Sequence, residues 1–355
     1  MDIAKPQTIL HGLNGLQDFL AGHRFLLVHG KSFEGFGVSH VFDVFQHTVF
    51  TGFSPNPLYE QVVDGVKAFN ENGCDMIVAV GGGSAIDVAK CIKLYCRMDP
   101  AVNYLRQTPC DIGIPLIAIP TTAGTGSEST RHAVIYFNGV KQSISHPSIR
   151  PDVAVLEPTF LDTLPDYQRK YAMLDALCQA VESWWSMRAT NESMEYSRQA
   201  VELIQNKWRE YIFDKSRQSA TVIMQAANYS GRAIDITTTT APHAMSYKLS
   251  SLYGIPHGHA VALCMLPVWR YMRKYVENCK DGGTKRLKTI FDEITIDEYW
   301  YEKLIMGLKM IHPVSESRET DIETLTCSVN PERLANNPVP LERDTIKEIY
   351  RSIVK

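Results

Sequence analysis

Short apolar runs alternate with helical patterns along the first half of the chain. Four of these runs predict buried strands, at residues 25–28, 76–80, 115–119 and 153–156. Apolar positions at helical spacing predict helices at residues 58–70 and 85–96. Continuous apolar runs are typical of strands covered on both faces, and their alternation with helices favours a parallel sheet. We therefore expect a doubly wound α/β domain with a mostly parallel sheet.

The pattern changes near residues 164–166, where strand-like runs stop and long amphipathic stretches begin. Helices are predicted at residues 169–187, 192–213, 217–234, 258–275, 285–294, 299–311 and 344–354. The polar residues 315–321 are expected to form a surface loop or the start of a helix. Before the change, residues 134–144 predict a hairpin whose Asn138-Gly139 turn is of type I′. The chain is thus divided into an α/β domain at residues 1–165 and an all-helical domain at residues 166–355.

Composition and charge narrow the class of protein. Of 355 residues, 45% are hydrophobic and 21% are charged, which is ordinary for a globular protein with a sizeable core. The net charge of −3 gives no reason to expect a nucleic acid or an anionic membrane as partner. No apolar run reaches membrane-spanning length, and the first residues lack the apolar core of a signal peptide. The eight cysteines form no Cys-x-x-Cys pair, so we expect reduced thiols and a cytoplasmic location.

Two glycine-rich loops each follow a predicted strand. Residues 81–84 read Gly-Gly-Gly-Ser and lead into a helix, and residues 120–127 are rich in Thr, Gly and Ser. Glycines let backbone N–H groups approach a pyrophosphate, and the start of a helix attracts its negative charge. The spacing matches neither the usual dinucleotide fingerprint nor a P-loop, and a simple tight turn would explain residues 81–84 alone. The second loop favours a nucleotide site.

Two histidines and one aspartate form the candidate metal site. His243 lies in a run that is compatible with a helix, and His257 follows Pro256 at the start of another. A helix, a bend and a second helix can bring two imidazoles, the commonest neutral metal ligands, to one point. Asp175 lies in a mostly apolar helical run, where a buried carboxylate needs a partner such as a metal ion. The alternatives are two packed or capping histidines and a carboxylate bonded to a helix N-terminus.

Several motifs resemble those of the iron-containing, or group III, alcohol dehydrogenases, in the dehydroquinate synthase-like superfamily. The matching stretches are GGGSAIDVAK (81–90), IPTTAGTGSE (119–128), SISHPSIRPDVAVLEP (143–158), the Asp175 helix, and HAM with PHG (243–258). The resemblance implies a nucleotide-binding domain, a helical domain, and a metal in the cleft between them. It implies that NAD(P)H is held by Gly82, Gly83, Ser84, Asp87, Thr121, Thr122, Ser127 and Lys141, and a divalent metal by Asp175, His243 and His257.

Three positions depart from the family pattern. The histidine that usually follows the aspartate by four residues is Gln179, a poor ligand for a borderline metal, so Fe²⁺, Zn²⁺ and a metal-free site stay open. Gly30 stands where many members carry an aspartate for the ribose 2′-hydroxyl. Lys31 and Ser32 then favour a 2′-phosphate, hence NADPH over NADH. Tyr247 replaces a histidine, and it is expected either to relay a proton or simply to pack.

The stretches LDALCQAVESWWS and APHAMSYKLSSLYGIPHGHAVALCMLP look like the phosphonoacetaldehyde reductase branch of the family. A phosphonate dianion needs fixed positive charge, for which Arg131, Arg232 and Lys248 are the candidates. The expected reaction is reduction of a small aldehyde, in this branch phosphonoacetaldehyde to 2-hydroxyethylphosphonate, with Tyr247 and the ligand His257 as catalytic residues. The alternatives are a general short-chain alcohol or diol dehydrogenase, a dehydroquinate synthase-like cyclase or lyase, and a degenerate member without metal. Because dimers are usual for the family, a homodimer is expected.

Overall fold

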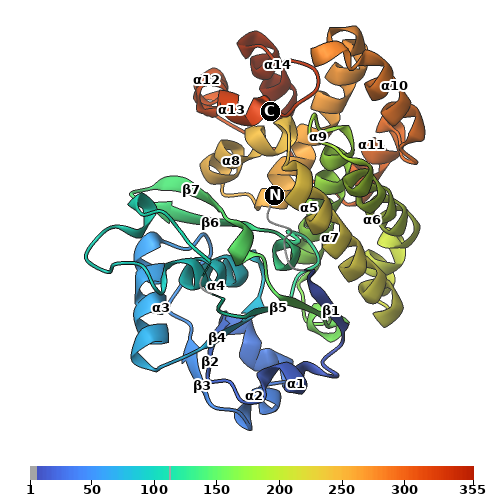
Figure 1. The fold of residues 1–355 in the computed structure, drawn as a ribbon. Coiled ribbons are helices and arrows are strands. Elements are labelled where there is room, and N and C mark those ends of the chain that lie inside the picture. The colour runs from blue at the N-terminus through green and yellow to red at the C-terminus, as the bar shows by residue number, and fades with distance from the viewer. Residues whose placement is uncertain (1–5, 112) are drawn as a thin grey trace. The chain divides into compact units, whose positions relative to one another are not determined.

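The computed structural model describes residues 6–111 and 113–355, and its contacts divide the chain into two compact units. The first unit contains the chain up to Leu164 together with Lys215–Met224. The second unit contains Pro165–Asp214 and Gln225–Lys355. Figure 1 shows strands in the first unit and only helices, with their connections, in the second.

A six-stranded parallel sheet is the centre of the first unit. Neighbouring strands follow the order β1 (Thr8–His11), β8 (Val153–Leu156), β5 (Leu116–Pro120), β4 (Met76–Gly81), β2 (Phe25–His29) and β3 (His47–Phe50). Every pairing within this sheet is parallel. The prediction of a doubly wound α/β domain is confirmed, because helices cover both faces of the sheet.

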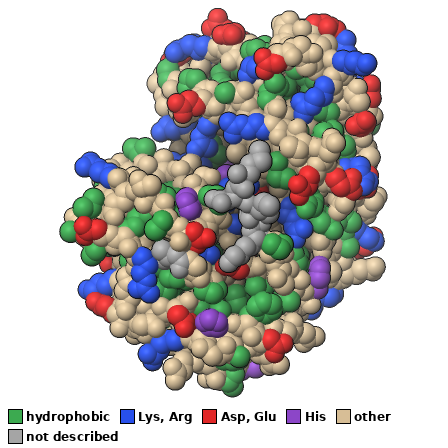
Figure 2. Space-filling view, in the orientation of Figure 1, with side chains coloured by type: hydrophobic (Ala, Val, Ile, Leu, Met, Phe, Trp, Pro, Cys, Tyr) green, Lys and Arg blue, Asp and Glu red, His purple; other side chains and the backbone are tan. Residues whose placement is uncertain are grey.

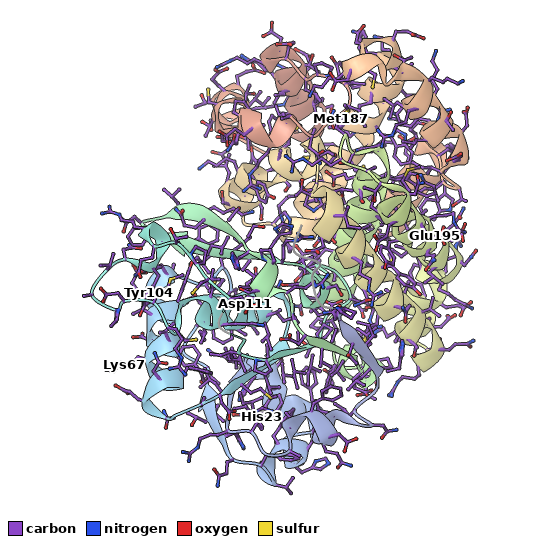
Figure 3. The ribbon with its side chains drawn as sticks, in the orientation of Figure 1. His23, Lys67, Tyr104, Asp111, Met187 and Glu195 are labelled. Atoms are coloured by element: carbon purple, nitrogen blue, oxygen red, sulfur yellow. The ribbon has the colours of Figure 1, made fainter. Side chains whose placement is uncertain are left out.

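Alternate side chains of the strands build two separate apolar cores, one on each face of the sheet. Leu26 and Val28 pack with helices α3 (Tyr59–Glu71) and α4 (Gly83–Tyr95). Phe25 and Leu27 pack with the short helices α1 (Leu16–Leu20) and α2 (His40–Asp43) on the other face. Tyr104, labelled in Figure 3, closes the first core by stacking on Tyr95 with 5.2 Å between ring centroids.

The predicted hairpin is formed by β6 (His132–Phe137) and β7 (Val140–Ser145). Its turn residues Asn138 and Gly139 have φ of 50° and 73°, as a type I′ turn requires. The expected strands and helices of this unit form within a few residues of their predicted ends. Strands β1 and β3 were missed because they lie at the edges of the sheet, where half-exposed residues break the apolar run.

The second unit is a helical bundle around α5 (Asp166–Trp185), which is buried along most of its length. The other helices are α6 (Asn191–Arg209), α7 (Arg217–Thr237), α8 (Ala241–Tyr253), α9 (His257–Lys274), α10 (Thr284–Glu293), α11 (Glu298–Gly307), α12 (Arg318–Ser328), α13 (Pro331–Leu334) and α14 (Arg343–Ile353). Helix α7 begins among residues of the first unit and continues into the second. Among the described residues, no helix is long and apolar enough to cross a membrane.

Candidate metal centre and nucleotide loops

Three helices of the second unit bring Asp175, His243 and His257 to one place. One ligand atom from each residue lies within 4.8 Å of the other two. Nε2 of His243 is 3.3 Å from Oδ1 of Asp175, and Nε2 of His257 is 4.0 Å from the same oxygen. Helix α8 ends at Tyr253 and is capped by Gly254, whose φ of 63° is left-handed, and α9 starts at His257 directly after Pro256. The bend between α8 and α9 therefore turns the second imidazole toward the first.

The carboxylate of Glu182 fixes the orientation of His243. Nδ1 of His243 donates a hydrogen bond to Oε2 of Glu182, which is fully buried. Oε1 of Glu182 accepts from the backbone N–H and the hydroxyl of Thr240, each at 2.9 Å. With the proton held on Nδ1, the neutral imidazole presents its Nε2 lone pair toward Asp175. This carboxylate–histidine arrangement is the usual outer support of a metal-binding imidazole.

A serine on α8 orients His257 in the same way. The hydroxyl of Ser246 donates to the backbone carbonyl of His243 at 2.8 Å. The same oxygen lies 3.3 Å from Nδ1 of His257, and it can accept the Nδ1 proton because its own proton is already used. In their neutral forms both histidines would therefore turn an unprotonated Nε2 toward the same carboxylate oxygen.

A divalent metal fits this donor set. In the neutral imidazole the buried Nε2 of His243 and the buried Oδ1 of Asp175 are two acceptors that face each other at 3.3 Å, and a metal ion would satisfy both. Two imidazoles and one carboxylate satisfy three positions of tetrahedral Zn²⁺, and the same set suits Fe²⁺. Burial by itself lowers the pKa of His243, but the carboxylates of Glu182 and Asp175 outweigh burial and raise it to about 9. In the metal-free protein this histidine therefore holds a proton with which a metal competes.

Close packing of α9 against α5 sets the distance between these ligands. A Cβ atom added to Gly258 would lie 2.2 Å from the carbonyl oxygen of Tyr171 and 2.9 Å from Cβ of Asp175. Only glycine allows the backbone next to His257 to approach the backbone of the aspartate helix this closely. The ligand geometry thus depends on the residue that directly follows His257.

Gln179 and Tyr247 take different places beside the cluster. Gln179 is buried, and its Oε1 accepts a hydrogen bond from the hydroxyl of Ser230 on α7 at 3.1 Å. The ring of Tyr247 stacks on that of His257, with centroids 5.4 Å apart and planes at 4°. A guanidinium N–H of Arg333 on α13 donates to the Tyr247 hydroxyl at 3.0 Å. Tyr247 is thus held between a ligand histidine and an arginine that the sequence analysis did not identify.

The nucleotide loops lie in the first unit, after three neighbouring parallel strands. Gly30 follows β2, Gly82 follows β4, and Thr121 follows β5. Because carboxyl ends of parallel strands share one edge of the sheet, these loops meet there. The backbone N–H of Thr121 donates to the carbonyl of Gly81 at 3.0 Å, and an added Cβ on Gly83 would lie 3.1 Å from the Thr125 side chain. Helix α4 begins at Gly83, so a positive helix end faces the loop edge.

Asp87 and Ser127 are engaged within the protein. The Ser127 hydroxyl donates to Oδ1 of Asp87 at 2.7 Å, and the Val134 N–H donates to Oδ2 at 2.9 Å. Nζ of the fully buried Lys90 donates to Ser127, to Thr130 and to the carbonyl of His132. Burial raises the pKa of Asp87, and the charge of Lys90 opposes that shift. This network fixes the second loop to α4, and direct contact of Asp87 and Ser127 with a cofactor stays a prediction.

The remaining residues predicted to bind cofactor or substrate lie on separate elements of the two units. In the first unit Lys31 is exposed after Gly30, Lys141 is half-buried on β7, and Arg131 is half-buried just before β6. In the second unit Lys248 is half-buried on α8, and the guanidinium of Arg232 lies 5.6 Å from the ring centroid of Tyr196 on α6. The contact described for Arg232 is therefore with a neighbouring helix and not with the metal cluster. Their substrate and cofactor roles stay predictions.

Sequence reasoning missed Glu182, Ser246 and Arg333. Glu182 carried a signal, because it follows Asp175 by two helical turns on a helix already identified and so lies on the same face. Ser246 is separated from His243 by one turn, which gives a weaker signal of the same kind. Arg333 carried none, because α13 reaches α8 only through the tertiary fold.

Comparison with known proteins defines the class to which this fold and site belong. The family model described as "Iron-containing alcohol dehydrogenase" matches residues 6–158. The model described as "Fe-containing alcohol dehydrogenase family, C-terminal" matches residues 170–354. The chain belongs to the iron-containing alcohol dehydrogenase family, and the predicted family, fold and oxidoreductase class are confirmed.

The chain is similar to the following three proteins. Phosphonoacetaldehyde reductase of Streptomyces viridochromogenes is 34% identical over 239 residues, which is 62% of this chain and 59% of that protein. Sulfoacetaldehyde reductase from Bifidobacterium kashiwanohense, solved in complex with NAD⁺, superposes with a TM-score of 0.88 at 26% identity, covering 99% and 98% of the two chains. A 1,3-propanediol oxidoreductase superposes with a TM-score of 0.87 at 25% identity, covering 98% of each chain. Family membership and the His/Asp cluster support the expected nicotinamide cofactor and divalent metal.

Proposed function

We propose that this protein reduces a small aldehyde to a primary alcohol with NAD(P)H and a divalent metal ion, Fe²⁺ or Zn²⁺. The observation that carries the proposal is the convergence of Asp175, His243 and His257 within 4.8 Å, with Glu182 behind His243. A metal bound by these three side chains supplies a Lewis acid that polarises the substrate carbonyl. The three ligands leave a coordination position open for the substrate, as catalytic metal sites do.

The glycine-rich loops of the first unit are proposed to bind the cofactor. Gly82, Gly83 and Ser84 offer backbone N–H groups at the start of α4 to the pyrophosphate, and Thr121 and Thr122 line the neighbouring strand end. Lys141 is proposed to hydrogen-bond a ribose. Hydride comes from the reduced nicotinamide, while the loops hold and orient the cofactor.

A proton must reach the oxygen of the reduced substrate. Tyr247 is proposed to deliver it, because its ring stacks on the ligand His257 and its hydroxyl is hydrogen-bonded to Arg333. A Tyr247→Phe variant keeps the ring stack and removes only the hydroxyl. The proposal predicts a fall in kcat of about 100-fold or more, the contribution expected of one acid–base group.

The proposed substrate is phosphonoacetaldehyde, with 2-hydroxyethylphosphonate as product. The support is the 34% identity to a phosphonoacetaldehyde reductase and the similarity of fold to a sulfoacetaldehyde reductase. Both relatives are named for an aldehyde that carries an acidic group. A second candidate is a general short-chain alcohol or diol dehydrogenase, which the similarity to a 1,3-propanediol oxidoreductase favours. Family membership supports either over the cyclase or lyase alternative.

NADPH is proposed as the preferred cofactor. Lys31 is exposed directly after Gly30, and a Cβ added to Gly30 meets no atom within 4 Å. The position thus has room for a 2′-phosphate and a nearby cation to pair with it. A Gly30→Asp variant is expected to shift the ratio of kcat/KM toward NADH by at least about tenfold, because a carboxylate repels the phosphate and binds the 2′-hydroxyl. An unchanged ratio would remove this proposal.

The experiment measures NADPH and NADH oxidation with phosphonoacetaldehyde, acetaldehyde, propanal and glyceraldehyde, on protein loaded with Fe²⁺ or Zn²⁺. Preference for phosphonoacetaldehyde supports the proposed substrate, and equal or faster rates on neutral aldehydes support the general dehydrogenase. Asp175→Asn and His257→Ala are expected to lose bound metal together with activity. Glu195→Gln, on the exposed side of α6 (Figure 3), is the control. Absence of turnover with every aldehyde and metal would overturn the proposal.

A further inference from the structure

Trp185, the last residue of α5, extends the contacts of the candidate metal site beyond Glu182. Its indole Nε1 donates a hydrogen bond to the hydroxyl of Thr240 at 3.0 Å, and that hydroxyl donates to Oε1 of Glu182 at 2.9 Å. The other oxygen of Glu182 accepts from Nδ1 of His243. A sequence of hydrogen bonds therefore runs from an indole through a hydroxyl and a carboxylate to a candidate metal ligand.

The chemistry of the groups determines the direction of each hydrogen bond in this sequence. An indole N–H can only donate, so the Thr240 oxygen must be the acceptor toward Trp185. The single proton of the hydroxyl is then directed to Glu182, whose carboxylate can only accept. The contact with Trp185 therefore turns the hydroxyl proton of Thr240 toward Glu182.

Glu182 also caps the helix that carries His243. Thr240 is the N-cap residue of α8, and its hydroxyl would ordinarily accept from an N–H of the first turn, but it makes no such bond. Oε1 of Glu182 accepts instead from the backbone N–H of Thr240 at 2.9 Å and from that of His243 at 3.3 Å. One carboxylate thereby fixes both the start of α8 and the imidazole that this helix carries.

The connection between α7 and α8, which leads into Thr240, is itself held in place. Nδ2 of Asn336 donates to the carbonyls of Thr237 and Thr239, at 2.9 and 3.0 Å. The hydroxyl of Thr237 lies 2.9 Å from that of Ser183 on α5. These contacts hold the backbone of the connection before any ligand binds, as a group that orients a site requires.

The three groups behind His243 are shielded from water. Trp185 and Glu182 are fully buried, and Thr240 is 1% exposed. On the face shown in Figure 2, by contrast, charged side chains lie on the surface of the second unit, where water weakens their interactions. In the buried network, hydrogen bonds to a carboxylate are strong, and the loss of one donor is costly because water does not replace it.

We propose that Thr240 and Trp185 are positioning residues of the metal site. The indole directs the hydroxyl, and the hydroxyl holds the carboxylate of Glu182 against His243; this rests on the metal-dependent reduction proposed above. With the carboxylate held, the neutral imidazole carries its proton on Nδ1 and turns its Nε2 lone pair toward Asp175. Without the hydroxyl, the carboxylate loses a donor and can rotate, so the affinity of the site for a metal falls.

Trp184 provides a matched control on the same helix. It is buried like Trp185, but its Nε1 has no hydrogen-bond partner among the described residues. Trp184→Phe therefore removes an indole without breaking a hydrogen bond, whereas Trp185→Phe also removes the donor to Thr240. A difference in metal affinity between these two variants reports on the N–H group and not on lost packing.

The test measures Zn²⁺ affinity by competition with a chromogenic chelator, together with the visible absorption of Co²⁺-loaded protein, which depends on coordination geometry. Thr240→Val removes the hydroxyl at nearly constant volume, and we expect the affinity to fall by about 10- to 100-fold. Thr240→Ser keeps the hydroxyl and should stay within about threefold of the unchanged protein. Trp185→Phe is expected to lose about three- to tenfold, and Trp184→Phe less than about twofold, because only the first breaks a hydrogen bond.

A double variant distinguishes positioning from a general loss of stability. If the indole acts only through the hydroxyl, Thr240→Val combined with Trp185→Phe should bind Zn²⁺ as weakly as Thr240→Val alone. Fully additive losses would overturn the proposal, as would equal losses in Trp184→Phe and Trp185→Phe. If Trp185→Phe does not fold, Thr240→Val and Thr240→Ser still provide the test, because equal affinities in these two variants would overturn the proposal.

The affinities are measured without turnover, so the positioning role and the proposed function can fail separately. If Thr240→Val binds metal as tightly as the unchanged protein, and the unchanged protein reduces an aldehyde, the positioning role fails and the reductase stands. If Thr240→Val loses affinity but the unchanged protein reduces no aldehyde, the positioning role stands and the reductase fails. An unchanged protein that binds no divalent metal would overturn both.

Discussion

The carboxylate of Glu182 accepts the Nδ1 proton of His243 across the contact between α5 and α8. Helix α5 also carries Asp175. One helix therefore supplies a candidate metal ligand and the carboxylate that orients a second candidate ligand, His243. Glu182 is fully buried and satisfied by Thr240 and His243 together. The arrangement of the three candidate ligands thus depends on a residue that is not itself one of them.

A Glu182→Gln substitution tests this relationship. The amide keeps an oxygen for Thr240 and places an NH₂ group against Nδ1 of His243, which must then become the acceptor. The imidazole proton moves to Nε2, which no longer binds a metal. We expect metal affinity to fall by about 10- to 100-fold, measured by competition with a chromogenic chelator. Glu195→Gln on α6 is the control, and equal affinities in both variants would contradict the assignment.

The pH dependence of metal uptake follows from the titration of His243. Its pKa is raised to about 9 in the metal-free protein, mainly because the carboxylates of Glu182 and Asp175 outweigh burial. The metal must displace this proton, so apparent affinity is expected to rise about tenfold per pH unit between pH 7 and pH 9. Measured Zn²⁺ affinity that does not change over this interval would show that His243 is already neutral.

The raised pKa of His243 also predicts how the stability of the metal-free protein depends on pH. A histidine whose pKa is higher in the folded state stabilises that state fully below its unfolded pKa of about 6.5, and this contribution is lost as pH rises through about 9. Removal of metal with a chelator is therefore expected to leave a protein whose thermal midpoint is lower at pH 9.5 than at pH 7. The difference should shrink in His243→Asn, which carries no titrating group. An equal difference in both proteins would assign the effect to other groups.

A Gly258→Ala substitution tests whether the close approach of α9 to α5 stabilises the protein and its metal site. In Gly258→Ala the new Cβ would lie 2.2 Å from the carbonyl oxygen of Tyr171, a backbone atom that cannot rotate away. We expect the free energy of unfolding to fall by about 1–3 kcal/mol, with weaker metal binding because His257 moves with α9. The control is Gly307→Ala at the end of α11, where the new Cβ meets only Trp208 at 3.8 Å. Equal stability of the two variants in urea unfolding would contradict the packing argument.

A Lys90→Met substitution tests the hydrogen-bond network that attaches the second glycine-rich loop, residues 120–127, to α4. Lys90→Met removes donors to Ser127, Thr130 and the His132 carbonyl, and it removes the larger of the two positive charges that act on the buried Asp87. We expect a loss of about 3–5 kcal/mol in the free energy of unfolding, as for other broken buried charge pairs. Cofactor affinity should fall as well, because the loop loses its attachment to α4.

Lys67→Met is the control for Lys90. Lys67 is exposed on α3 (Figure 3), and its pair with Glu71 at 3.8 Å contributes little in water. Urea unfolding followed by circular dichroism and titration with NADPH measure the two effects. A Lys90 variant as stable as the Lys67 variant would show that the network does not hold the loop.

The amino-acid pattern by itself determined the main elements and the family. Strands such as residues 76–81 are covered on both faces, so their apolar runs stand out in the sequence, and the order of strands and helices then predicts a parallel sheet. The glycine loops and the motifs around Asp175, His243 and His257 could be predicted from the sequence. Close approach of the backbone to a ligand requires glycine, and metal binding requires particular side chains. Edge strands β1 and β3 could not be predicted from the sequence, because only part of each strand is buried.

Tertiary structure alone decided what surrounds the site. Glu182 and His243 are 61 residues apart in sequence, and Arg333 and Tyr247 are 86 apart, so no local pattern relates either pair. Their partnership arises from helix packing that burial of apolar surface drives, and that driving force has no direction and does not specify which polar groups will meet. The sequence predicted residues for a metal and a nucleotide, whereas the fold determined the hydrogen-bond partners of the two imidazoles and the location of the arginine beside Tyr247.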